Sequence, residues 1–265
     1  MKLKVGFLGT ADNIASHLLL QELKNQNIYP QQIILEQSRG KSLRKRIIRK
    51  FRHARLLQTI IRIFYGVVLL LRNRGILRKS ASIGAGADVK IVRDLNGFDC
   101  QKTLAASKVD ILILCTGSLI KRSIFSIPRL GAIKAHPGWI PAYRGIGSML
   151  AMLRDGFLPA ISVHFIDEGV DTGPLVCRET IYDDVIGFDQ ERETNWLKAQ
   201  ARMFRKALIL IEDSQYQEGY SNFDLFYERS SMTLGISTKE AKGIIRKAQR
   251  DRNRLAAFEN QNVKY

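Results

Sequence analysis

The stretch VDILILCTG, at residues 109–117, constrains the fold of this chain more than any other part of its sequence. It is a nearly continuous apolar run that ends at a glycine, and it lacks the apolar/polar alternation of a strand with one exposed face. Such a run is typical of a strand buried on both faces of a parallel sheet, with helices on either side. The rest of the chain therefore has to supply two layers of helices around this strand.

The segments on both sides of this run alternate between strand-like and helix-like patterns. Further strands are expected at residues 2–10, 28–37, 88–92 and 132–136. Helices are expected at residues 12–26, 99–108, 124–131 and 147–156. Asp12 or Asn13 is expected to cap the first helix. This alternation predicts an α/β fold with an open, mostly parallel, Rossmann-like sheet flanked by helices.

One large domain is expected to occupy residues 1–213. A chain of 265 residues with 45% hydrophobic residues is long enough for such a core. Near its end, strands at 161–167 and 174–181 are expected to form a hairpin, followed by a helix at 189–213. Residues 214–265 contain a basic helical pattern, so we expect a helical C-terminal extension there.

A basic segment, residues 39–79, dominates the net charge of +17. It contains fourteen Lys and Arg residues, and no acidic residue occurs between positions 37 and 87. Such a block favours polyanions, either nucleic acid or an anionic membrane surface. Its apolar residues recur at three- and four-residue steps, which predicts a helical insertion. Two interpretations stay open, an interfacial amphipathic segment and an insertion packed on its own domain.

Several classes of protein are disfavoured by what the sequence contains. Cys100, Cys115 and Cys177 have neither paired nor metal-like spacing, which indicates free thiols and no metal site. Gly6 and Gly9 lack the third glycine of a dinucleotide-binding turn. No run reaches the roughly 18 apolar residues of a membrane span, and the apolar start is too short for a signal peptide. We therefore expect a cytoplasmic protein, peripheral at the inner face of the membrane if the basic segment binds lipid.

Two segments carry the candidates for chemistry, GAIKAHPGWIPAYRG at 131–145 and SVHFIDEGVDTGPLV at 162–176. The first places His136 within a turn-forming stretch, and the second places His164 close to several carboxylates. Both lie at the ends of apolar strands, where open α/β sheets form their ligand clefts. A His beside a carboxylate is suited to moving a proton at neutral pH. The residues alone therefore predict an acid/base enzyme, with a structural His and a solvated acidic turn as the alternatives.

The two segments resemble the folate-dependent formyltransferase family, which includes glycinamide ribonucleotide transformylase, methionyl-tRNA formyltransferase and the sugar N-formyltransferases. The resemblance covers residues 107–180, including TGSLIKRSIFSIPRLGAIKAHPGWIPAYRG, and implies the formyltransferase version of the Rossmann-like sheet. It implies transfer of a formyl group from 10-formyltetrahydrofolate to a primary amine. The family's catalytic trio is an Asn, a His two residues later and an Asp in the later loop. His136 matches the His and Asp171 matches the Asp.

The resemblance also implies where the two substrates bind. The donor is expected to lie against Gly117, Ser118, Leu119, Ile120, Asp167, Glu168 and Gly169. The acceptor is expected to lie against Gly138, Tyr143, Arg144, Gly145 and His164.

Lys134 stands where the family has its catalytic Asn, and three interpretations of this departure stay open. The ammonium group can donate to an oxyanion in place of the amide. It can instead pair with Asp171 and draw the carboxylate away from His136. The third interpretation is a protein that keeps the fold and has lost or changed the transfer. A modified but active transferase is the prediction we take forward.

The expected acceptor is an amino sugar, nucleotide- or lipid-linked, because the HPG…YRG form of the loop resembles that of sugar-modifying members. Methionyl-tRNA is the alternative acceptor, favoured by the positive charge and disfavoured by a C-terminal part too short for a β-barrel domain. A catalytically altered protein that binds a membrane surface or RNA is the alternative from a different class. The resemblance also leaves room for a homodimer.

Overall fold

A computed structural model describes residues 2–37, 86–145, 147–155, 157–181, 190–214 and 226–227. The basic segment at 39–79 and nearly all of the predicted extension at 214–265 lie outside these residues. The pair Phe226–Tyr227 forms a short strand, β9, within the region expected to be helical. It pairs in parallel with β6, Arg144–Gly145, at the end of the first candidate segment.

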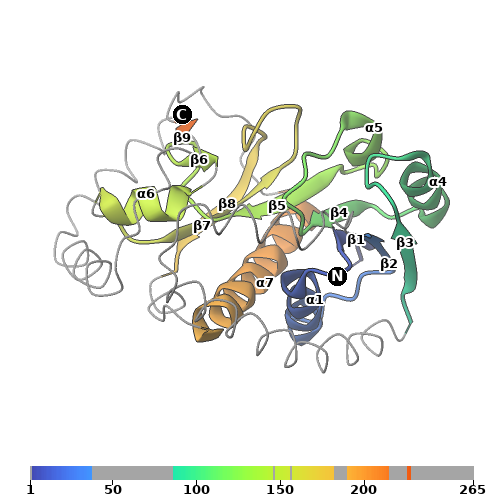
Figure 1. Ribbon diagram of the computed structural model, residues 1–265, viewed down its shortest axis with the longest axis horizontal. Coiled ribbons are helices and arrows are strands. Elements are labelled where there is room, and N and C mark those ends of the chain that lie inside the picture. The colour runs from blue at the N-terminus through green and yellow to red at the C-terminus, as the bar shows by residue number, and fades with distance from the viewer. Residues whose placement is uncertain are drawn as a thin grey trace, which may run out of the picture.

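The described strands form one seven-stranded sheet in the order β3-β2-β1-β4-β5-β7-β8 (Figure 1). The strands are β1 Val5–Thr10, β2 Gln32–Glu36, β3 Asp88–Val92, β4 Ile111–Leu114, β5 Ala132–His136, β7 Ala160–Phe165 and β8 Leu175–Thr180. The first five are parallel, whereas β7 runs antiparallel to both β5 and β8. The predicted open, mostly parallel sheet is confirmed.

Helices cover both faces of this sheet. They are α1 Ile14–Asn25, α4 Phe98–Ser107, α5 Arg122–Phe125, α6 Ser148–Arg154 and α7 Gln190–Glu212. The Asn13 side chain caps α1 by accepting a hydrogen bond from the Ala15 backbone N–H at 3.0 Å. The predicted helix at 124–131 begins two residues earlier than expected, at Arg122, and it ends at Phe125. The early end is consistent with Pro128, which has no N–H with which to continue a helix. No helix among the described residues is long and apolar enough to cross a membrane.

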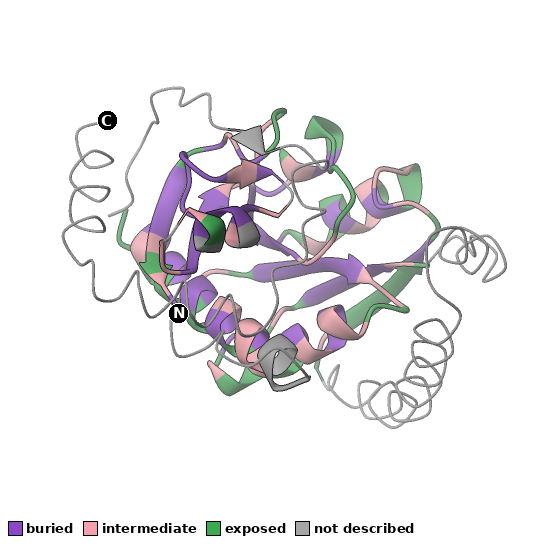
Figure 2. Ribbon diagram, turned by 60° about the vertical axis from the view of Figure 1, so that its left-hand side comes forward, coloured by how far each residue is buried: buried purple, intermediate pink, exposed green. Residues whose placement is uncertain are grey.

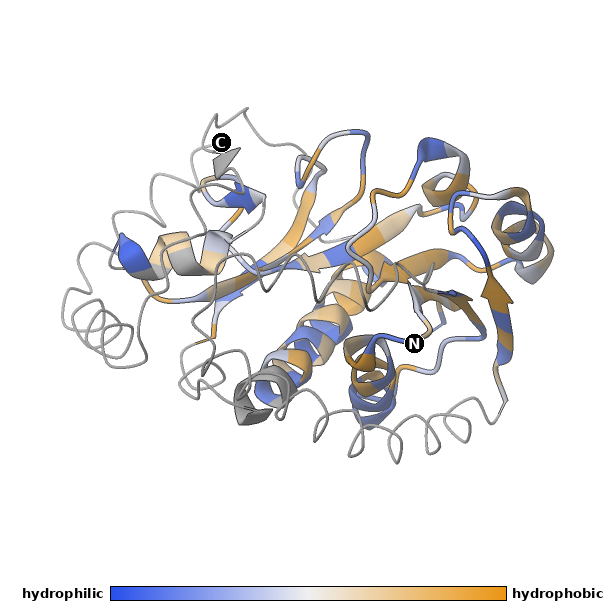
Figure 3. Cartoon of the chain, in the orientation of Figure 1, coloured by the Kyte–Doolittle hydropathy of each residue, from blue (hydrophilic) through white to orange (hydrophobic). Residues whose placement is uncertain are grey.

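Two apolar layers cover the sheet, one on each face. α1 and α7 pack against one face, where they bury Phe7, Ile113 and Ile133. α4 and α5 pack against the other face, where they bury Leu112 and Leu114. Figure 2 shows the central strands as buried, and Figure 3 shows them as the most hydrophobic part of the chain. All four residues of β4 are buried, as the run at 109–117 predicted.

Phe204 provides a test of the α7 layer. Its side chain is fully buried between α7 and the sheet. We expect Phe204→Ala to lower the free energy of unfolding by about 3–5 kcal/mol, because it removes apolar contacts and leaves a cavity. Ile209→Ala on the same helix is the control, since Ile209 is 45% exposed, and it should cost less than about 1 kcal/mol. Urea unfolding followed by circular dichroism measures both changes, and equal losses would contradict the layer described here.

Candidate active site

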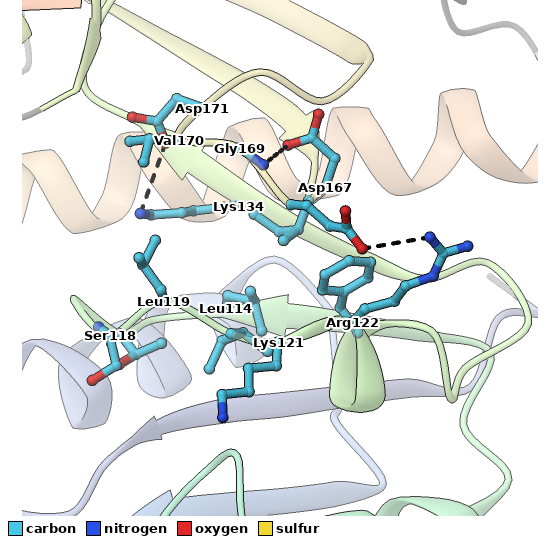
Figure 4. A pocket seen from close by; sticks show the side chains of 15 residues that line it. Leu114, Ser118, Leu119, Lys121, Arg122, Lys134, Asp167, Gly169, Val170 and Asp171 are labelled. Carbon is cyan, nitrogen blue, oxygen red and sulfur yellow. Dashed lines mark hydrogen bonds and ion pairs between the residues drawn. The ribbon is translucent and has the colours of Figure 1, made fainter.

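A cleft of about 400 Å³ lies beyond the carboxyl end of β4. One wall is the segment that follows β4 and enters α5, and the other is the loop between β7 and β8 (Figure 4). The apolar part of its lining consists of Leu114, Leu119, Ile120, Phe125, Ile166 and Val170. All the residues predicted to bind the donor line this cleft except Gly117, which lies between the lining residues Thr116 and Ser118. The residues predicted to bind the donor therefore lie together on one contiguous surface.

The carboxylate of Asp171 is the centre of the polar contacts beside this cleft. One oxygen, Oδ2, lies 3.1 Å from Nδ1 of His136 and accepts a hydrogen bond from the Gly145 backbone N–H at 3.0 Å. The other, Oδ1, lies 3.5 Å from Nε2 of His164 and 3.9 Å from Nζ of Lys134. Asp171 has a φ of +52°, in the left-handed region that Asp tolerates better than most residues. The β7–β8 loop thus turns this carboxylate inward.

These contacts also determine the charge of Asp171. Burial by itself would raise the pKa of this carboxyl group. Hydrogen bonds from His136 and His164, together with the positive charges of His136 and Lys134, outweigh burial and hold the pKa far below its usual range. Asp171 is therefore an anion throughout the physiological pH range.

His136 is buried, with 2% of its surface exposed, and both its ring nitrogens have protein partners. Nδ1 faces Asp171, which can only accept a hydrogen bond from it. Nε2 lies 2.9 Å from the Tyr143 carbonyl oxygen and 2.9 Å from the hydroxyl oxygen of Ser148. Ser148 in turn donates to the Gly145 carbonyl oxygen at 2.9 Å. His136 thus lies behind Asp171 as seen from the cleft, and among the described residues it is not part of the cleft's lining.

Lys134 reaches the cleft where His136 does not. Both residues lie on β5 with their side chains on the same face, two positions apart. The Lys134 side chain is 33% exposed, and its ammonium group lines the cleft together with Asp171. At 3.9 Å from Oδ1 it forms an ion pair too long for an N–H···O hydrogen bond, so its hydrogens can still reach a ligand. Figure 4 shows Lys134 pointing into the cleft between Leu119 and Asp171.

The residues predicted to contact the acceptor surround His136 and do not line the cleft in the described part of the chain. Tyr143 and Gly145 contribute the backbone groups already described, and the Tyr143 hydroxyl donates to Asp155 at 3.0 Å. Arg144 and Gly145 form β6. His164 is 1% exposed and its Nδ1 donates to the Phe165 carbonyl oxygen at 2.7 Å. In this structure the loop at 138–145 encloses the His136 ring.

Gly138 has no room for a side chain. A Cβ atom there would lie 2.5 Å from the Tyr143 carbonyl oxygen and 2.8 Å from both Nε2 of His136 and Cβ of Ser148. The backbone has to approach this closely for Tyr143 and Ser148 to reach the imidazole ring. Gly138 therefore supports the site through the position of its backbone.

Three residues that the sequence reasoning missed also support the site. Asn96, in the loop before α4, donates from its amide to the Leu119 carbonyl oxygen at 2.9 Å and accepts from the Lys121 N–H at 2.7 Å. It thereby fixes one wall of the cleft. Ser162 donates to the Gly138 carbonyl oxygen at 2.7 Å and accepts from the Ile140 N–H at 3.0 Å. Ser148 contacts His136, and only its place just after the YRG motif could have drawn attention to it.

Comparison with known proteins gives a consistent result. Residues 93–195 match the family model described as formyl transferase. Over 104 residues the chain is 28% identical to the methionyl-tRNA formyltransferase of Chlorobium limicola, a match that covers 39% of this chain and 33% of that protein. The chain thus matches about a third of the length of such curated relatives.

Two solved structures share the fold. Glycinamide ribonucleotide transformylase 1 from Symbiobacterium toebii superimposes with a TM-score of 0.50 and 18% identity, covering 80% of this chain and 88% of that one. A sugar N-formyltransferase from a Shewanella species superimposes with a TM-score of 0.50 and 11% identity, covering 94% and 88%. At these identities the similarity establishes the architecture and leaves the substrate open.

Asp171 makes stability depend on pH in a defined direction. Its pKa is lower in the folded chain than the value of about 3.9 expected in the unfolded chain. The stabilisation from its ionised form is therefore complete above about pH 4 and is lost as the pH falls below that value. We expect the difference in free energy of unfolding between the wild type and Asp171→Asn to be largest at neutral pH and to shrink below about pH 4. Urea unfolding at a series of pH values measures this difference in free energy. Asp12→Asn is the control, because Asp12 is exposed. A wild-type-to-Asp171→Asn difference that does not change with pH would contradict the prediction.

Gly138→Ala should displace the groups that hold His136. Because the nearest atom belongs to the backbone, relief requires the loop itself to move, and we expect a loss of about 1–3 kcal/mol in the free energy of unfolding. The His136 ring signals in an NMR spectrum should shift at the same time. Gly117→Ala is the control, since its new Cβ would meet no atom within 4 Å. An unchanged His136 spectrum in Gly138→Ala would show that the contacts described here do not hold the ring.

Proposed function

Since the chain belongs to the formyl transferase family over residues 93–195, we propose that it transfers a formyl group from 10-formyltetrahydrofolate to a primary amine. The observation that carries this proposal is the juxtaposition of Lys134 and Asp171 at the end of an apolar cleft. An ammonium group and a carboxylate at this position give the two charges that attack on a formyl carbon needs.

The cleft suits the donor in size and in lining. Its volume of about 400 Å³ lies within the range of about 300–1,000 Å³ that small-molecule sites occupy. The apolar side chains of Leu119 and Val170 offer contact for a flat ring. Asp167 folds the opposite wall, because its carboxylate accepts hydrogen bonds from the Gly169 N–H at 3.0 Å and the Thr172 hydroxyl at 2.6 Å. The donor supplies a formyl carbon bonded to a nitrogen atom.

Lys134 is the residue that we place at the formyl oxygen. When an amine attacks the formyl carbon, negative charge develops on that oxygen, and a positioned donor stabilises it. Such a donor typically contributes about 2.7–4 kcal/mol to the transition state. Lys134 then takes over the task that the family's Asn performs, with a full charge and a longer reach.

Asp171 and His136 support the positively charged Lys134 from the protein side. Asp171 stays ionised, holds Lys134 at the cleft and attracts the proton of the attacked amine. His136 orients Asp171 through Nδ1 and is itself fixed by Tyr143 and Ser148. In the balanced reaction the bond from the formyl carbon to the acceptor nitrogen forms and the bond to the donor nitrogen breaks. One proton leaves the acceptor amine and one reaches the donor nitrogen.

We place an amino sugar, nucleotide- or lipid-linked, first among the acceptors, and its support is the form of the loop from His136 to Gly145. Methionyl-tRNA is the second candidate, supported by the match to methionyl-tRNA formyltransferases and by the net charge of +17. A catalytically altered protein that binds an anionic partner is the alternative function. The ion pair between Lys134 and Asp171 favours it, because it can hold the ammonium group away from a substrate.

Substitution of Lys134 tests the proposed function. We expect Lys134→Ala to lower the single-turnover rate by about 10²–10³-fold, because one donor to the oxyanion is lost. Lys134→Asn should retain more activity than Lys134→Ala, since it restores an amide donor. The measurement is release of tetrahydrofolate and formation of the formylated amine, with 10-formyltetrahydrofolate and a panel of nucleotide-linked amino sugars and methionyl-tRNA.

Lys102→Ala serves as the control, because Lys102 is exposed on α4 away from the cleft. Binding of the stable analogue 5-formyltetrahydrofolate is measured in parallel. A wild type that binds the analogue without transfer, next to an active Lys134→Asn, would show that Lys134 has switched the enzyme off. A wild type that neither transfers nor binds the analogue would refute the proposed function.

A further inference from the structure

The outer strand of the sheet exposes apolar side chains on one face. Val89 is 47% exposed and Ile91 is 61% exposed, both on β3. Among the described residues β3 pairs only with β2, so it forms an edge of the sheet. Figure 2 shows β3 in the colour of exposed residues next to the buried central strands. An uncovered apolar edge of this kind favours association with another segment or another chain.

The exposed side chains point to the face of the sheet that α1 covers. Val89 is the register partner of Ile33, and Ile91 is the register partner of Leu35. Ile33 and Leu35 belong to the core layer of α1, whereas Val92 belongs to the layer of α4. We call the surface formed by Tyr29, Val89 and Ile91 the β3 face.

A groove lies beside the β3 face. It has a volume of about 340 Å³ and is lined by Leu20, Lys24, Ile28, Tyr29, Ile33 and Ala87, among others. Tyr29 is itself 60% exposed. The groove and the β3 face therefore form one apolar surface that continues the layer of α1 outward.

The handedness of crossovers predicts which connection should pass over this surface. Parallel strands of one sheet are joined by right-handed crossovers in about 98% of cases. The chain moves outward from β1 to β2 through α1, and it moves outward again from β2 to β3 through residues 38–85. Two right-handed connections that both move outward across the sheet have to lie on the same face of the sheet, so the connection from β2 to β3 is expected on the face that α1 covers. On the way back from β3 to β4 the direction reverses, and α4 accordingly lies on the opposite face (Figure 1).

The connecting segment has an apolar stripe that matches this surface. Its 48 residues exceed the dozen or so that a crossover needs. The stripe consists of Leu56, Leu57, Ile60, Ile61 and Phe64, which recur at helical spacing, and a five-residue step separates it from an earlier apolar set at Ile47, Ile48 and Phe51. Arg55 and Arg62 fall on the opposite side of a helix with this spacing.

We propose that the β3 face and its groove are the docking surface for the apolar stripe of residues 56–64 of the same chain. Three features support this occupant. The connection begins at the end of β2 and ends at the start of β3, a right-handed crossover takes it over the α1 face, and it contains apolar residues at helical spacing. Docking leaves Arg55 and Arg62, on the opposite side of the stripe, directed toward solvent. The segment then presents positive charge to an anionic partner without apolar side chains to insert into a bilayer.

The test compares two substitutions of exposed apolar residues by aspartate. Ile91→Asp places a charge within the proposed docking surface, and Phe98→Asp places one on α4, where Phe98 is 75% exposed. Trypsin cleavage within residues 39–79 of the folded full-length chain is followed by mass spectrometry. Cleavage follows the population of the undocked segment, so we expect Ile91→Asp to accelerate it about tenfold or more. Phe98→Asp should change it by no more than about twofold, as surface substitutions do.

A reciprocal substitution keeps the test valid if Ile91→Asp disturbs the sheet. Ile60→Asp changes the occupant and leaves the sheet intact, and it should accelerate cleavage to the same extent. The double variant should be cleaved no faster than either single one, because both remove one interaction. Hydrogen exchange of β1 and β4 confirms that the core of each variant remains folded.

Three results would overturn the proposal. In the first, the wild-type segment is cleaved as fast as the Ile91→Asp segment. In the second, protection appears only after addition of vesicles that contain anionic phospholipid, which would make the membrane the occupant. In the third, protection increases with protein concentration, which would make a second copy of the chain the occupant. The proposal is supported if the wild-type segment resists cleavage regardless of vesicles and protein concentration, and if Ile91→Asp and Ile60→Asp each remove that resistance.

Discussion

The buried carboxylate of Asp171 is the interaction on which the arrangement of the site depends. A buried anion is tolerated only when positive charge and hydrogen-bond donors surround it. Here the donors come from separate parts of the chain, namely His136 on β5 and the backbone of Gly145, while Nε2 of His164 on β7 lies 3.5 Å from the carboxylate. Asp171 thereby fixes the loop at 138–145 against the sheet and sets the depth of the cleft. Lys134 completes the charge balance from the solvent side.

This arrangement separates the tasks of the two basic residues on β5. His136 has its ring nitrogens occupied by protein atoms and therefore acts on Asp171, whereas Lys134 faces the space that a ligand would enter. The departure from the Asn of the formyltransferases that the chain resembles thus lies at a position that lines the cleft together with Asp171, whereas His136 does not line it. A change there alters the group presented to the cleft and leaves the contacts of His136 in place.

The same sheet explains both the site and the surface at its edge. The cleft lies beyond the carboxyl end of β4, next to β5, and this edge is the one at which open α/β sheets form ligand clefts. The connection through α1 lies on the face where β3 exposes its apolar residues, and the connection through α4 lies on the opposite face. The right-handedness of crossovers accounts for the places of both helices.

The sequence by itself determined the local elements and the candidate residues. The strand at 132–136 matches its prediction residue for residue, and the predicted donor surface falls on one cleft, because apolar runs and turn residues act locally. Only the tertiary structure decided that Lys134 and not His136 lines the cleft, that β7 runs antiparallel to β5, and that Asn96 and Ser148 support the site. These outcomes depend on side-chain direction and on contacts between residues far apart in the chain, which no local pattern encodes.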